Sequence, residues 1–305
     1  MKGVAVPNVH PDEIEIDLHV VQRLLGEQFP QWAGLPLQRF PSYGTVNTLF
    51  RLGDELCVRL PRLLAEVPTY VTEQIHKEAE WLPRLSPHLP AQVPVVVGHG
   101  EPSEDYPYSW AVYRWLEGEP PLRATDALAH EVAAFITALQ RIDPTGAPAT
   151  MSRAQPLVAH DSATRAALTR LHGEIDVPAA TRAWERALEA PNWEKSLVWV
   201  HGDLLAANLL LRNGRLSAVL DWGSLCSGDP ACDLMIAWSL LAPVRDEFRA
   251  TVDLDDATFE RGRGWALSQA VIALPYYLHT NPPMMAHARS AISGVLTDAR
   301  PADSR

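Results

Sequence analysis

The chain has 305 residues, of which 47% are hydrophobic and 21% charged, a composition typical of a globular protein of one or two domains. Its formal net charge of −11 at pH 7 speaks against a nucleic-acid-binding protein, which is expected to carry a basic face. The apolar stretches are too short to span a bilayer and the first 17 residues do not read as a signal peptide, so we expect a cytoplasmic protein without a membrane partner. The three cysteines lack zinc-ligand spacing and are expected to be reduced thiols.

The first part of the chain predicts one helix and then a series of short strands. The helix is expected over 12–29, where the apolar residues that share one side are Ile14, Leu18, Val21, Leu24 and Leu25. Strands are expected over 39–41, 48–52 and 55–60. Between the last two, Gly53-Asp54 predicts a two-residue turn, which would pair Leu52 with Glu55 and therefore Thr48 with Arg59.

That register places Arg59 level with the end of a loop over 42–47. The loop contains small residues whose backbone N–H groups can bind phosphate oxygens: Ser42, Gly44, Thr45 and Asn47. The guanidinium of Arg59 would add a positive charge with bidentate reach. The sequence therefore predicts a phosphate-binding site at this loop.

A second helix is predicted over 70–85, with Ile75, Ala79, Leu82 and Leu85 on one side. The ranges 93–98 and 110–115 are expected to complete a small sheet. Helices follow over 126–140, 162–171, 179–188, 234–241, 257–278 with a kink at Pro275, and 286–296. We expect an N-terminal nucleotide-binding domain over 1–112, a hinge over 113–118, a helical catalytic and substrate domain over 119–296, and a disordered tail over 297–305.

The most informative segment is His201-Gly202-Asp203, which is followed by Asn208 and then by Leu220-Asp221-Trp222. An Asp followed five positions later by an Asn, with a second Asp further on, is the spacing of a phosphoryl-transfer catalytic loop. In that chemistry Asp203 would orient an attacking hydroxyl and take its proton. Asn208 and Asp221 would hold Mg²⁺ against the phosphates of a nucleotide.

Local geometry supports the metal site independently. Asn213-Gly214 predicts a type I′ hairpin that pairs Arg212 with Arg215 and hence Asn208 with Val219. Asp221 then lies on the same face as Val219 and diagonal to Asn208, roughly 5–8 Å away at Cβ. Two oxygen ligands at this separation suit Mg²⁺, which prefers few protein ligands together with phosphates and water.

These motifs, together with Gly228-Asp229-Pro230 and Asp233-Leu234, resemble the aminoglycoside phosphotransferase family of antibiotic kinases. The resemblance implies an α+β, protein-kinase-like two-lobe fold with a small antiparallel sheet in the N-lobe and a mainly helical C-lobe. It also implies that Asp203 is the catalytic base, that Asn208 and Asp221 bind Mg²⁺, and that His201 and Asp233 hold the catalytic loop.

The resemblance extends to the nucleotide site. Arg59 stands where better-known members carry Lys, and Glu78 is its expected partner; Glu80 is the alternative, pointing about 200° away on the helix. The linker begins Tyr113-Arg114-Trp115-Leu116, and its backbone from Arg114 to Leu116 would hydrogen-bond the purine.

The expected activity is Mg²⁺-dependent transfer of the γ-phosphoryl of ATP or GTP to a hydroxyl of a small molecule, with an aminoglycoside-type antibiotic as the first expectation. A macrolide kinase and a metabolic kinase for an amino alcohol, sugar or nucleoside stay open, as do a nucleotide-binding pseudokinase and a metal-dependent hydrolase. Seven acidic residues could bind a cationic acceptor or serve as helix caps and dipole partners: Asp161, Glu174, Asp176, Asp253, Asp255, Asp256 and Glu260.

Overall fold

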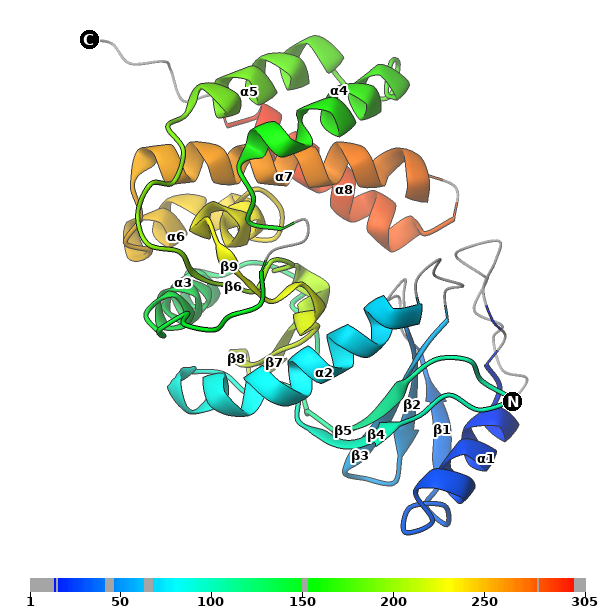
Figure 1. Ribbon diagram of the computed structural model, residues 1–305. Coiled ribbons are helices and arrows are strands. Elements are labelled where there is room, and N and C mark those ends of the chain that lie inside the picture. The colour runs from blue at the N-terminus through cyan, green and yellow to red at the C-terminus, as the bar shows by residue number, and fades with distance from the viewer. Residues whose placement is uncertain are drawn as a thin grey trace. The chain divides into compact units, whose positions relative to one another are not determined.

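The computed structural model describes Ile14 and residues 16–41, 47–62, 68–149, 153–278 and 280–298. The chain divides into two compact units (Figure 1). Unit 1 runs up to Pro87 and includes Val93–Glu117, and unit 2 consists of His88–Gln92 and the chain from Gly118 onward. Among the described residues, no helix has the length and apolar character needed to cross a membrane. The assignment of a nucleotide-binding and a catalytic domain stays a prediction.

Unit 1 is built on a five-stranded antiparallel sheet in the order β1-β2-β3-β5-β4. The strands are β1 (Leu37–Phe40), β2 (Asn47–Leu52), β3 (Leu56–Pro61), β4 (Val96–Gly100) and β5 (Trp110–Arg114). One face packs its buried Phe50 and Val58 with helix α1 (Leu18–Gln28). The other face, with Ala111 and Tyr113, packs against Ile75 of helix α2 (Pro68–Leu85), which ends in a 3₁₀ turn (Ser86–His88).

Both helices of unit 1 differ from the prediction. Helix α1 begins at Leu18 rather than at residue 12, because the Asp17 carboxylate caps it by accepting the Val20 N–H at 2.9 Å. Leu18, which was expected on the apolar side, is exposed at 39%. In α2 the predicted Ala79 is exposed, and Glu78, one position earlier, is buried instead.

The turn between β2 and β3 contains three residues, not two. Leu52 pairs with Leu56, so Arg59 lies opposite Leu49 and the predicted pairing with Thr48 is wrong. A shift of one residue moves side chains to the other face of a sheet. The observed register therefore places Asn47 and Arg59 on the same face, whereas the predicted register would have separated them.

Unit 2 is mainly helical and is organised around a long buried helix, α7. Its helices are α3 (Asp126–Gln140), α4 (Asp161–Arg170), α5 (Val177–Glu189), α6 (Arg245–Thr251), α7 (Asp256–Tyr277) and α8 (Pro282–Leu296). Figure 1 shows α4 and α5 on one side of α7 and α8 beside it, and all three contact it. The predicted combination of a small antiparallel sheet with a mainly helical remainder is confirmed.

Two short antiparallel strand pairs and several 3₁₀ segments complete unit 2. The pairs are β6 (Val198–Val200) with β9 (Cys226–Gly228), and β7 (Leu209–Arg212) with β8 (Arg215–Val219). The 3₁₀ segments are Leu157–His160, Ala206–Asn208, Trp222–Ser224, Pro230–Trp238 and Ala242–Val244. The helix predicted over 234–241 is thus a 3₁₀ segment that starts earlier, and α6 was not predicted.

The C-terminal end of the described chain is anchored. Asp298 is buried, accepts the indole N–H of Trp238 at 2.8 Å and pairs with Arg245 at 3.0 Å. The tail predicted over 297–305 therefore begins too early, and residues 299–305 lie outside the described residues.

Candidate active site

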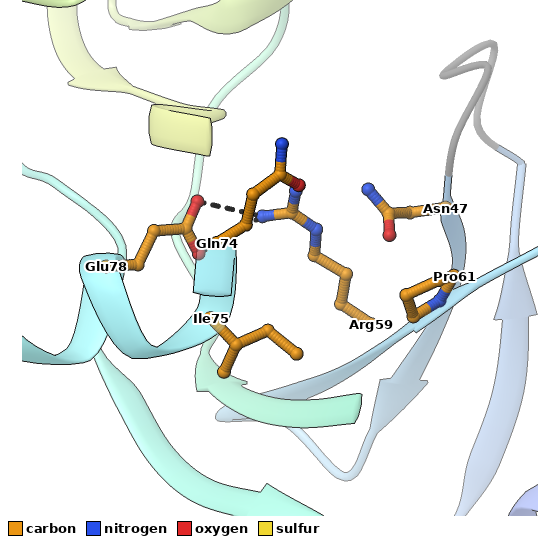
Figure 2. A pocket seen from close by; sticks show the side chains of 6 residues that line it. All are labelled: Asn47, Arg59, Pro61, Gln74, Ile75 and Glu78. Carbon is orange, nitrogen blue, oxygen red and sulfur yellow. Dashed lines mark hydrogen bonds and ion pairs between the residues drawn. The ribbon is translucent and has the colours of Figure 1, made fainter. Parts of the chain in front are cut away.

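In unit 1, a candidate site centres on the guanidinium of Arg59, which Figure 2 shows between Glu78 and Asn47. Its Nη1 donates to both carboxylate oxygens of Glu78, at 3.0 and 3.2 Å. With its amide oxygen turned to the guanidinium, Asn47 accepts from Nε at 2.9 Å and Nη2 at 3.0 Å. The planar guanidinium thus bonds Glu78 on one side and Asn47 on the other, whereas a lysine has a single ammonium group. This double contact explains the arginine at this position.

Glu78 is the buried centre of this network. Its side chain is 1% exposed, and it also accepts the phenol O–H of Tyr113 at 2.5 Å. Burial and the adjacent Glu78 raise the pKa of Tyr113, which therefore remains a donor. Glu80 pairs instead with Arg84 at 3.4 Å, so the expected choice of Glu78 over Glu80 as the partner of Arg59 agrees with the structure.

The residues around Arg59 form a small pocket. It is lined by Asn47, Arg59, Pro61, Gln74, Ile75 and Glu78 (Figure 2). Gln74 and Pro61 were not singled out from the sequence. Ser42, Gly44 and Thr45 lie outside the described residues, so their expected phosphate contacts stay a prediction.

If this network positions Arg59 for a nucleotide phosphate, Arg59 and Glu78 must be energetically coupled. Arg59→Ala is expected to weaken nucleotide binding by roughly 1–3 kcal/mol, the value of a charged hydrogen bond. Glu78→Ala is expected to cost less, and the double variant should be non-additive. Titration calorimetry measures all three, with Glu80→Ala as a control that leaves affinity unchanged. Additive losses would mean that Glu78 does not act through Arg59.

The predicted purine-binding linker is only partly available for new hydrogen bonds. The Arg114 N–H donates to the Val95 carbonyl at 2.9 Å and the Trp115 N–H to the Glu55 carbonyl at 2.7 Å. Of the predicted backbone donors from 114 to 116, those two are already used inside unit 1. Their carbonyls and the backbone of Leu116 would have to bind the base.

In unit 2, strand β6 leads directly into the loop His201-Gly202-Asp203. Gly202 has a φ of +83°, and a Cβ there would lie 2.9 Å from the Ser224 side chain and carbonyl, so the turn requires glycine. Buried Asp233 accepts the N–H groups of His201 at 2.8 Å and Gly202 at 2.7 Å. Burial raises the pKa of Asp233 to about 7, against the opposing effect of these two N–H donors.

His201 is fully buried and neutral. Its Nδ1 accepts the Asp203 N–H at 3.2 Å, so the proton lies on Nε2, which donates to the Leu220 carbonyl at 3.0 Å. Burial lowers its pKa to about 4. Both ring nitrogens are therefore occupied by the backbone, and His201 fits the predicted role of holding the loop rather than of exchanging protons with a substrate.

Asp203 presents a partly exposed carboxylate, 26% accessible, at the end of this loop. Asn208 Nδ2 donates to its carbonyl at 2.9 Å and lies 3.4 Å from its Oδ2. Burial raises the pKa of this carboxyl to about 6, while the Arg153 guanidinium acts in the opposite direction. Such a group is suited to accept a proton near neutral pH.

The hairpin that joins Asn208 to Asp221 contains a bulge. Arg212 pairs with Arg215 as predicted, but the register shifts between Leu210 and Leu211, so Val219 lies opposite Leu209 and the predicted Asn208–Val219 pairing is wrong. An extra residue in one strand does this. The Asn208 carbonyl instead accepts the Leu220 N–H at 2.7 Å, which keeps Asp221 next to this end of the hairpin.

The two predicted metal ligands have donor atoms that fit Mg²⁺. Because Asn208 uses its Nδ2 toward Asp203, its amide oxygen is turned the other way. Asp221 has a left-handed backbone, with φ +61° and ψ +71°, and its charge acts on the pKa of both His201 and Asp203. One carboxylate and one amide oxygen are the type and number of protein ligands that Mg²⁺ takes beside nucleotide phosphates.

The segment that follows Asp221 is held by a buried ion pair. Asp229 caps the Pro230–Trp238 segment and accepts from Arg261 of α7 twice, from Nε at 2.7 Å and Nη2 at 3.0 Å. Arg261 also donates to the Pro191 carbonyl at 2.5 Å and to Thr258 at 3.1 Å. Asp229 belongs to the Gly228-Asp229-Pro230 motif, but its partner Arg261 was not predicted, because the neighbouring charges of Glu260 and Arg263 give no signal of burial.

The sequence profile of the phosphotransferase enzyme family, APH, matches residues 38–266, which is most of the chain. The solved GDP and kanamycin complex of APH(2")-IIia superposes with a TM-score of 0.70 at 16% identity, over 93% of this chain and 100% of that one. Macrolide 2'-phosphotransferase MphH from Brachybacterium faecium gives 0.57 at 22% identity, over 93% and 99%. A macrolide 2'-phosphotransferase type I gives 0.60 at 19%, over 92% and 98%. A search of curated proteins finds no significant match.

At these identities the solved structures establish the fold, and the protein-kinase-like fold expected from the motifs is confirmed. The family profile covers the Arg59 network, the loop with His201 and Asp203, and Asp221. The chain therefore belongs to the phosphotransferase enzyme family, and it is a phosphotransferase with an alcohol group as acceptor.

Proposed function

We propose that this enzyme transfers the γ-phosphoryl group of ATP or GTP to a hydroxyl of an antibiotic-like small molecule, with Mg²⁺. The observation that supports it best is the Asp203 carboxylate, which is partly exposed and held next to Asn208 by a loop whose histidine is neutral and fully bonded. A carboxylate in this position can orient the acceptor hydroxyl and take its proton.

The other residues position the reactants. Arg59, fixed by Glu78 and Asn47, would bind phosphate oxygens through its guanidinium. Asn208 and Asp221 would hold Mg²⁺, which supplies positive charge that offsets the charge developing on the phosphates. Since phosphoryl transfer asks little covalent help from the protein, positioning and charge neutralisation account for most of the catalysis.

The metal ligands give a direct prediction. Asp221→Asn is expected to abolish the Mg²⁺ dependence of nucleotide binding, because the only carboxylate of the proposed ligand pair loses its charge. Calorimetric titration of ATP and GTP with and without Mg²⁺ measures this dependence. Glu194→Gln, which neutralises an exposed carboxylate of unit 2, should behave like the parent. A variant that keeps the parent's Mg²⁺ dependence would remove Asp221 from the metal site.

For the acceptor, an aminoglycoside-type antibiotic is our first candidate, in line with the family resemblance. Six of the seven acidic residues suggested for a cationic acceptor, all except Asp253, already pair with a cation or cap a helix in unit 2, which weakens the support for an acidic acceptor site. Ion pairs join Asp161 to Arg165, Glu174 to Arg289, Asp255 to Lys195, Asp256 to Arg249 and Glu260 to Arg263, while Asp176 and Asp255 cap helices. This observation favours a macrolide as the second candidate, because it carries less positive charge.

A salt series separates the two candidates. kcat/KM is measured for an aminoglycoside and for a macrolide between about 20 and 500 mM salt, since electrostatic capture weakens as charges are screened. A marked fall for the aminoglycoside supports the first candidate, and turnover of the macrolide alone supports the second. Phosphorylation of only a sugar or an amino alcohol would reject both antibiotic acceptors and leave the phosphotransferase activity in place.

A further inference from the structure

Arg153 contacts the proposed catalytic carboxylate of Asp203 from a segment of unit 2 that lies far away in the sequence. Its Nη2 lies 3.4 Å from Oδ1 of Asp203, although the two residues are fifty positions apart in the chain. Their side chains are 23% and 26% exposed, so the contact is partly shielded from water. No motif in the sequence pointed to this residue.

The backbone that carries Arg153 is held in one place. The next residue, Ala154, has a φ of +57°, an uncommon conformation for a residue with a Cβ. Its carbonyl accepts the Asp229 N–H at 3.1 Å. Gly228 makes this approach possible, because a Cβ there would lie 2.5 Å from the Ala154 Cβ and 2.6 Å from its oxygen. Strain of this kind persists only where the surrounding structure determines it.

Arg153 and Asn208 each contact one oxygen of the Asp203 carboxylate. Oδ1 faces the guanidinium at 3.4 Å, and Oδ2 faces the Asn208 amide at the same distance. Rotation of the carboxylate about its Cβ–Cγ bond would weaken both contacts together. The carboxylate is thus oriented by two groups that come from separate segments of unit 2.

We propose that Arg153 is a positioning residue of the phosphoryl-transfer site, which holds the Asp203 carboxylate in the orientation needed to accept the proton of the acceptor hydroxyl. This rests on the proposed function of Asp203. Because the role is exerted through Asp203, it should appear in kcat rather than in nucleotide affinity. It should also disappear once the carboxylate is replaced.

The test is a double-variant cycle on the full chain. Arg153→Ala is expected to lower kcat by about 10- to 100-fold, the cost of a misplaced catalytic group, with nucleotide Kd within about twofold of the parent. Arg153→Lys should recover part of the loss. In an Asp203→Asn background, Arg153→Ala should cause no further loss. Arg165→Ala removes an exposed arginine–carboxylate contact of the same unit and should leave kcat unchanged.

Thermal unfolding of each variant identifies loss of folding, and Arg153→Lys keeps the side-chain charge and length if the alanine variant is unstable. Equal kcat for parent and folded Arg153 variants, a full multiplicative loss in the Asp203→Asn background, or a rise in nucleotide Kd alone would overturn the inference. These outcomes differ from failure of the proposed function, in which the parent itself shows no Asp203-dependent transfer to any acceptor and no Asp203-dependent hydrolysis of the nucleotide.

Discussion

Asp203→Asn is expected to lower kcat by about 10²–10⁴-fold while nucleotide affinity stays close to that of the parent. The replacement has nearly the same size, but an amide cannot take a proton from the acceptor hydroxyl. Its neighbours hold the backbone independently of the carboxylate, since His201 accepts the Asp203 N–H and Asn208 donates to the Asp203 carbonyl. The loss should therefore fall on the chemical step.

Steady-state turnover with an accepted hydroxyl compound gives kcat, and calorimetry gives the nucleotide Kd. Glu194→Gln supplies the matched control for a neutralised carboxylate in the same unit. A folded Asp203→Asn enzyme that turns over at the parent's rate would show that another group, or none, removes the proton.

The largest loss of stability is expected at the buried pair of Asp229 and Arg261, which are 6% and 2% exposed. Arg261→Ala should lower the free energy of unfolding by about 3–5 kcal/mol, because it leaves a buried carboxylate without its counter-charge. Replacing both partners by apolar residues of similar volume, as in Asp229→Leu with Arg261→Met, should cost much less than either single change.

Urea unfolding followed by fluorescence and circular dichroism measures these differences, with both probes needed in a chain of two units. Arg289→Ala is the control, because Arg289 and Glu174 also lie 2.7 Å apart but are 42% and 41% exposed. Such a surface pair contributes about 0–1 kcal/mol. Similar losses from the buried and the exposed arginine would contradict the assigned role of burial.

The sequence predicted best where local chemistry decides the structure. Asn213-Gly214 produced the expected Arg212–Arg215 hairpin end, and Thr125 as cap and the apolar spacing of α3 match the predicted range 126–140. The motif around Asp203 and Asn208 identified the phosphotransferase family, because both residues lie in one short segment whose spacing is set by phosphoryl transfer.

Register was harder to predict, because it depends on residues that a turn or strand adds without an obvious signal. Glu55 extends the turn after β2 to three residues, and Ser217 adds a bulge to the second hairpin. Each moved a pairing by one position. The Asn47–Arg59 contact could not be foreseen from the predicted register, which placed these side chains on opposite faces.

Arg153 and Arg261 show the other limit. Both act through partners far along the chain, Asp203 and Asp229, which only tertiary packing brings to them. Arg261 lies between Glu260 and Arg263 in α7, so its neighbours in the sequence do not mark it as buried. Arg153 lies in a segment without periodicity, and nothing local distinguishes it from a surface arginine.

With Asp221 as the proposed Mg²⁺ ligand, its left-handed backbone would set stability and activity against each other at a single position. This conformation costs an ordinary residue about 1–2 kcal/mol, and glycine adopts it freely. A glycine here would relieve the strain and remove the carboxylate. A selection for heat resistance alone would thus favour the loss of the carboxylate at this position, so a thermostabilised version of this enzyme should be required to retain Asp221 throughout.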